Sequence, residues 1–191
     1  MTLLIIGLLL FLGSHSIRIF ADAWRSRQVA LRGEGVWKGA YSLMALLGLA
    51  LIVWGYADAR ATPVALWQPP LWTRHLTATL MLPVFVLWVA AYLPGNRLRA
   101  RVGHPLVAGV KIWAFAHLLA NGTLADLMLF GAFLVWAALD YSSLRRRDRA
   151  SGKTWPAGSL QRDLIAVALG LAAYAGFAIY LHPLLIGVRV W

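Results

Sequence analysis

The sequence predicts an all-α membrane protein, a polytopic helical bundle with about six transmembrane helices. Composition is the first observation: 61% of the 191 residues are hydrophobic and only 13% are charged, whereas soluble proteins carry about 25% charged residues. The second is that hydrophobic stretches recur along the chain, each long enough for the roughly 20 helical residues that cross a bilayer. The third is the distribution of basic residues between the stretches, which alternates from loop to loop.

Six segments meet the length criterion, and we expect each to form one transmembrane helix. They are residues 3–20, 40–57, 76–93, 105–121, 123–141 and 164–187. At roughly 20 residues per span they leave no room for an independent soluble domain, so we expect one integral membrane domain over residues 1–191. Small residues in the segments predict close helix pairs. These are Gly7, Gly13, Gly48, Gly131, Gly170 and Gly176.

Basic residues in the loops predict the orientation. Thirteen lie in the first, third and fifth loops: Arg25, Arg27, Arg32, Lys38, Arg97, Arg99, Arg101, Arg145, Arg146, Arg147, Arg149, Lys153 and Arg162. Three lie on the other side: Arg60, Arg74 and Arg189. The positive-inside rule then places both termini outside the cytoplasm, which in the inner membrane of a bacterium means the periplasm.

The net charge of +11 is therefore an orientation signal that also suits anionic lipid headgroups. We expect membrane lipids as partners and no nucleic acid, because loops this short present no folded basic face. The chain has no cysteine, which excludes disulfides, thiolate metal sites and cysteine nucleophiles. No hydrolase, metalloprotease or phosphate-loop motif occurs either. Whether the protein is an enzyme, and its oligomeric state, stay open.

Histidines within spans are functional candidates because polar side chains are costly in a bilayer. His15 and His104 are expected near the cytoplasmic ends of the first and fourth spans, with Arg18 and Lys111 on the same helix faces. Two imidazoles from different helices suit the axial positions of haem b, and the two cations suit its propionates. A structural alternative has His104 capping the helix that starts at Pro105, while Arg18 and Lys111 extend to the headgroups.

Three further histidines are expected together near the periplasmic ends of their spans: His75, His117 and His182. Three imidazoles are a common ligand set for zinc or copper, and Asp126 could orient one of them. The structural alternative has His117 bonded to Asn121, and His182 bonded to a carbonyl freed where Pro183 interrupts the helix.

Local motifs along nearly the whole chain resemble those of the NnrU family of bacterial membrane proteins. They are Gly13–Arg18, Arg32–Glu34, Trp37–Leu43, Leu93–Gly95, Gly103–Pro105, Ala116–Gly122 and Leu181–Pro183. The resemblance implies a link to nitrite and nitric oxide metabolism in denitrification. It also implies a ligand such as nitric oxide or a hydrophobic small molecule.

That family is similar to cis-zeta-carotene isomerase, a haem b membrane enzyme with histidine axial ligands. By local motif its ligands correspond to His15, followed by serine, and His104, followed by proline. The resemblance implies isomerase-like haem chemistry on a polyene, although the cysteine that precedes the His-Pro motif in the isomerase is missing here. Two other hypotheses stay open: an accessory metal-binding protein for reductase maturation, and a transport or interaction protein without a cofactor.

Overall fold

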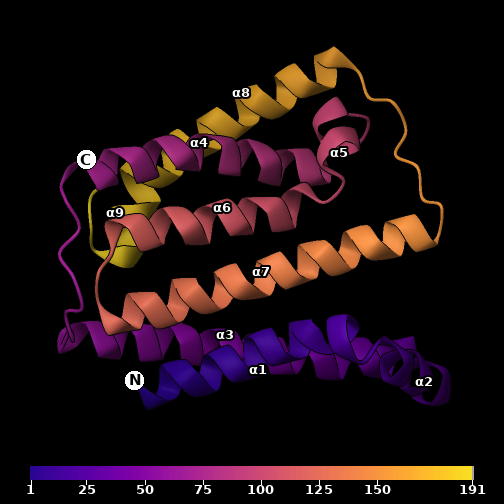
Figure 1. Cartoon of the computed structure of the whole chain (residues 1–191), viewed down its shortest axis with the longest axis horizontal. Coiled ribbons are helices and arrows are strands. Elements are labelled where there is room, and N and C mark those ends of the chain that lie inside the picture. The colour runs from indigo at the N-terminus through magenta and orange to yellow at the C-terminus, as the bar shows by residue number, and fades with distance from the viewer. Residues whose placement is uncertain (191) are drawn as a thin grey trace. The chain divides into compact units, whose positions relative to one another are not determined.

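The structure is a computed structural model that describes residues 1–190, and its regular secondary structure in that range is helical (Figure 1). The chain divides into two compact units. Unit 1 holds residues 1–67 and 122–140, and unit 2 holds residues 68–121 and those from 141 onward. The all-α fold predicted from the composition is confirmed.

Unit 1 contains the first three helices and the beginning of a fourth. These are α1 (Thr2–Phe20), α2 (Asp22–Arg32), α3 (Glu34–Ala61) and the first part of α7 (Leu124–Ala150). Helices α1 and α3 lie side by side (Figure 1). A Cβ atom on Gly7 would lie 2.6 Å from the backbone nitrogen of Ile52, and one on Gly48 would lie 2.7 Å from that of Phe11. The two backbones therefore meet directly, as small residues in membrane helices allow.

The start of α7 is fixed by a reciprocal cap. The Asp126 carboxylate accepts hydrogen bonds from the backbone nitrogen of Thr123 at 2.9 Å and from its hydroxyl at 2.6 Å, while the Asp126 nitrogen donates to the Thr123 hydroxyl at 3.2 Å. This is a capping box with aspartate in place of glutamate. The hydroxyl of Tyr56 on α3 donates to the other oxygen of Asp126 at 2.5 Å. The buried carboxylate thus links α3 to α7.

Unit 2 contains the remaining helices. These are α4 (Trp72–Tyr92), α5 (Arg97–Val102), α6 (Pro105–Ala120), the end of α7, α8 (Leu160–Gly176), a π-helical segment (Phe177–Leu181) and α9 (His182–Ile186). Helix α4 packs against both α6 and α8. The Thr77 hydroxyl donates to the Ala116 carbonyl at 2.6 Å, and a Cβ atom on Gly170 would lie 2.6 Å from the Cα of Val86. Contacts of this kind hold α4 close to both neighbours.

Five helical stretches are long and apolar enough to cross a membrane: α1, α3, α4, α7 and the continuous stretch Leu160–Ile186. They confirm five of the six predicted spans. The remaining predicted span is residues 105–121, which form the shorter apolar helix α6. Its 16 residues rise about 24 Å, which is less than the thickness of about 30 Å of a hydrocarbon core. Helix α7 continues past the predicted end at residue 141 to Ala150.

The prediction of close packing at glycine holds for part of the set. Gly7, Gly48 and Gly170 meet a neighbouring backbone. At Gly13 and Gly176, by contrast, an added Cβ meets no atom of the described chain within 4 Å. Composition identifies small residues but not the direction each one faces, which is why the prediction was only partly right.

Candidate functional site

His15 lies in the last turns of α1, where its imidazole contacts three aromatic rings. The ring centroids lie 4.3 Å from Phe11, 5.2 Å from Tyr41 and 5.9 Å from Trp136, the last in an edge-on arrangement. The indole nitrogen of Trp136 is buried, and within residues 1–190 it has no hydrogen-bond partner. The polar imidazole is therefore enclosed by the aromatic side chains of unit 1.

The hydrogen bonds of His15 determine which ring nitrogen is left for a ligand. Its Nδ1 lies 2.7 Å from the carbonyl oxygen of Phe11, one turn earlier. A carbonyl only accepts hydrogen bonds, so Nδ1 carries the proton in this arrangement and Nε2 carries the lone pair. The nearby Ser14 hydroxyl donates to the same carbonyl at 2.8 Å. His15 can thus offer Nε2 to an electrophile or metal ion.

Arg18, predicted beside His15, forms an ion pair with the first residue of α2. Its Nε lies 3.5 Å from the carboxylate of Asp22, and the two side chains are about half exposed. Its predicted role toward a propionate stays a prediction.

His104 occupies the junction between α5 and α6. Gly103 before it has a φ of +77°, a left-handed conformation that favours glycine, and Pro105 after it begins α6. His104 is the residue at the N-cap position, yet its side chain makes no capping hydrogen bond. The structural alternative, in which His104 caps the helix that starts at Pro105, is therefore confirmed for the position of the residue, although the imidazole takes no part in the cap.

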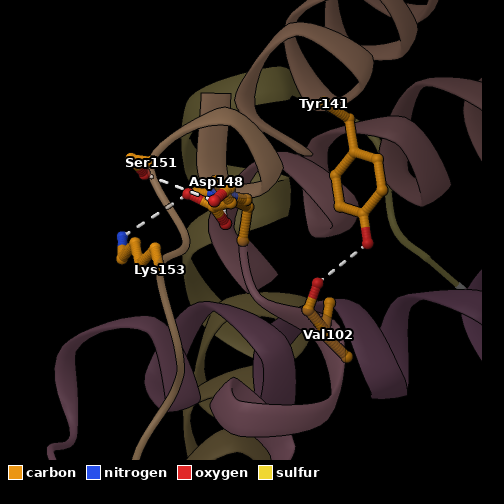
Figure 2. A network of polar contacts seen from close by, with 6 residues as sticks. Val102, Tyr141, Asp148, Ser151 and Lys153 are labelled. Atoms are coloured by element: carbon orange, nitrogen blue, oxygen red, sulfur yellow. Dashed lines mark hydrogen bonds and ion pairs between the residues drawn. The ribbon is translucent and has the colours of Figure 1, made fainter. Parts of the chain in front are cut away.

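The imidazole of His104 instead bonds to a carboxylate far away in the sequence. Its Nε2 lies 2.8 Å from Oδ2 of Asp148, and the two side chains are only 14% and 12% exposed. The Lys153 ammonium lies 3.7 Å from the other oxygen of Asp148. In Figure 2, Lys153 and Ser151 lie beside Asp148, and the hydroxyl of Tyr141 points to the Val102 carbonyl, to which it donates at 2.8 Å. The end of α7 is thereby joined to the α5–α6 junction.

An aromatic ring completes the surroundings of His104. Trp155 stands edge-on to the imidazole at 5.5 Å between centroids. The Lys153 ammonium lies 4.0 Å, and the Arg99 guanidinium 5.4 Å, from the centroid of the Trp155 ring, distances at which a cation is attracted to the ring. Lys111, predicted on the His104 side of α6, has its ammonium 4.9 Å from the Tyr141 ring centroid. Its charge is stabilised by an aromatic face in unit 2.

The three histidines predicted to share a periplasmic site differ in their surroundings, and two of them bond to nearby backbone carbonyls. The Nδ1 of His117 lies 2.9 Å from the Trp113 carbonyl, that of His182 lies 2.7 Å from the Val188 carbonyl, and His75 is exposed. The described part of the chain contains no group of three or more histidine, aspartate or glutamate residues that could hold one metal ion. The zinc or copper site stays a prediction.

Asp148 and Trp155 are the residues that sequence reasoning missed. Asp148 is the one acidic residue in the run from Arg145 to Arg149, where a solvated ion pair is the usual expectation. The sequence did contain a signal for Asp148, because a single carboxylate within a run of four arginines can indicate a specific partner. Trp155 lies in a loop five residues before α8, where a tryptophan is ordinarily assigned to the membrane interface.

The fold and the apolar lengths of its helices define a multi-pass helical membrane protein. The chain belongs to the NnrU protein family, whose family model matches residues 3–190. No curated protein and no solved structure matches the chain. The family predicted from local motifs is confirmed over nearly the full length.

Proposed function

We propose that this protein is a haem b protein of the bacterial inner membrane, with His15 as an axial ligand, acting in nitrite and nitric oxide metabolism. The observation that carries the proposal is the orientation of His15. Its Nδ1 lies 2.7 Å from the Phe11 carbonyl oxygen, and a hydrogen bond of this kind fixes the ring and leaves the lone pair of Nε2 for a metal ion.

The side chains around His15 have the chemistry that a flat apolar cofactor requires. Phe11, Tyr41 and Trp136 place three aromatic rings beside the imidazole, and aromatic faces of this kind can pack against a porphyrin. When bound, haem would supply an iron centre that takes up a small ligand such as nitric oxide or passes one electron. The chain's own contribution would be to hold the imidazole, fix its tautomer and keep the site apolar.

His104 remains the predicted second ligand. Its Nε2 is engaged by Asp148, so Nδ1 is the nitrogen left for a metal in this arrangement. A carboxylate that accepts from a ligating histidine raises the basicity of the ligand, which is the role Asp148 would have. His15 belongs to unit 1 and His104 to unit 2, and the proposed pairing of the two rests on the motif resemblance.

The test is the absorbance spectrum of detergent-purified protein together with a pyridine haemochrome assay. We expect a b-type spectrum from the unaltered protein and from His75→Ala, since His75 is exposed. We expect His15→Ala to lose the haem or to change its spin state. A colourless unaltered protein, or a His15→Ala variant with an unchanged spectrum, would refute the assignment.

The polyene chemistry implied by the isomerase resemblance is tested with the same material. A reduced haem-loaded protein incubated with a cis-polyene would yield the trans isomer if that activity is present, and His15→Ala would not. Unchanged polyene with fully loaded protein leaves the nitric oxide or electron-transfer function as the proposal.

A further inference from the structure

An apolar groove opens on unit 2, and no histidine lines it. It has a volume of about 510 Å³ and is lined by Phe85, Trp88, Val89, Tyr92, Leu93 and Ala173. Four of the six residues follow one stripe of α4, Leu93 is its C-cap residue, and Ala173 comes from α8. The volume lies in the range of about 300–1,000 Å³ that small-molecule sites occupy. The stripe covers the last turns of α4, and Tyr92 at its end is 76% exposed.

The groove ends beside a basic segment of the same unit. Leu93 lies only four residues before Arg97, the first residue of α5. Helix α5 is fastened to the first turn of α8, because one carboxylate oxygen of Asp163 accepts from the backbone nitrogens of Arg97 at 2.7 Å and of Leu98 at 3.1 Å. The basic cluster at this junction consists of Arg97, Arg99, Arg101 and Arg162.

The positive charge of this cluster exceeds the negative charge beside it. Asp163 contributes one carboxylate, of which one oxygen accepts from the backbone nitrogens of Arg97 and Leu98, while Asp148 pairs with His104 and Lys153. Within residues 1–190, none of the four arginines of the cluster forms an ion pair with a carboxylate, although Arg97 Nε donates to the Gly158 carbonyl at 3.2 Å. The cluster therefore keeps a net positive charge that an anion from outside the chain could bind, and arginine is well suited to phosphate.

We propose that unit 2 binds one anionic phospholipid, with an acyl chain in the α4–α8 groove and the phosphate on the basic cluster. The two features are complementary to the two parts of such a lipid and lie in the order that the lipid requires, apolar along α4 and cationic beyond its end. A soluble phosphate could use only the arginines, and a neutral lipid could use only the groove.

The test is native mass spectrometry of the detergent-purified full chain with phosphatidylglycerol and phosphatidylcholine of equal chain length. We expect the unaltered protein to retain phosphatidylglycerol about tenfold more strongly, since each arginine near an anionic headgroup contributes favourably. Arg97→Gln/Arg162→Gln should abolish this preference. The matched control Arg25→Gln/Arg27→Gln removes the same charge from unit 1 and should keep it.

A second variant tests the groove separately. Ala173→Leu fills space between α4 and α8, so it should lower the retention of both lipids while the preference between them persists. Ala173→Ser, which adds one polar atom at similar size, is the matched control and should retain both lipids. The Ala173→Leu result also keeps the proposal testable if the arginine double variant fails to fold.

Three outcomes would overturn the proposal. One is equal retention of the two lipids by the unaltered protein. Another is an equal loss of preference in the unit 1 control, which would indicate general charge attraction. The third is displacement of the bound lipid by millimolar inorganic phosphate with no effect of Ala173→Leu, which would indicate a simple anion site. None of these results depends on haem, so they are independent of the proposed function.

Discussion

One methyl group added at the contact between α1 and α3 tests the packing of unit 1. In Gly48→Ala the new Cβ would lie 2.7 Å from the backbone nitrogen of Phe11 and 3.0 Å from its Cα. Ordinary van der Waals contact begins at 3.4 Å, so the shortest approach is too close by about 0.7 Å. Both opposing atoms belong to the backbone and cannot rotate away. The two helices must therefore move apart.

The expected cost follows from two opposing effects. Overpacking in a well-packed contact costs about 1–3 kcal/mol, whereas alanine in a helix interior is favoured over glycine by about 0.5–1 kcal/mol. The difference between the midpoints of these two ranges is a net loss of about 1.3 kcal/mol. Because 1 kcal/mol shifts Tm by about 2–4 °C in a chain of this size, we expect Tm to fall by about 3–5 °C.

Gly13→Ala is the matched control on α1. It makes the same chemical change in a helix, but the added Cβ meets no described atom within 4 Å. Its Tm should stay level or rise by a few degrees, because only the helix preference of alanine acts there. The assay is the thermal loss of the monodisperse peak in fluorescence-detected size-exclusion chromatography. A Gly48→Ala variant as stable as Gly13→Ala would refute the direct backbone contact.

Three further substitutions have expected outcomes in the same assay. Asp148→Ala leaves the largely buried Nε2 of His104 without its partner, which costs about 1–3 kcal/mol, so Tm should fall by several degrees; an unchanged Tm would contradict the pair. Tyr56→Phe removes the donor to the buried carboxylate of Asp126, and a loss of about 1 kcal/mol, read as a lower Tm, is expected, whereas a higher Tm would argue against that link. Lys38→Gln breaks an exposed pair along one helix and should leave Tm unchanged because solvent screens such pairs; a drop of several degrees would show that the pair is shielded.

The membrane spans could be predicted because length and hydropathy are local properties. The segment 40–57 marks the apolar part of α3, but the helix itself runs from Glu34 to Ala61. Its extra turns are polar, and an ion pair between Glu34 and Lys38 at 2.9 Å supports the first of them. Hydropathy detects the part of a helix that lies in lipid, so the polar turns beyond it are invisible to that signal.

The candidate sites were predicted unevenly for a similar reason. His15 stands out in the sequence because it is polar within an apolar run, and its bond to the Phe11 carbonyl is a local contact. The partner of His104 could not be inferred, because Asp148 is 44 residues away and lies in an arginine-rich run. Its burial depends on how the end of α7 packs in unit 2. Contacts between distant segments of this kind are set by tertiary packing.

The central claim, that His15 holds a haem through Nε2, is tested most directly by chemical rescue. The measurement is the haem content of purified His15→Gly produced with and without imidazole in the medium. We predict that His15→Gly contains little haem when it is produced without imidazole. With imidazole in the medium we predict a restored b-type spectrum, because free imidazole can replace the missing side chain. Full haem content without imidazole, or no haem in either this variant or the unaltered protein, would contradict the claim.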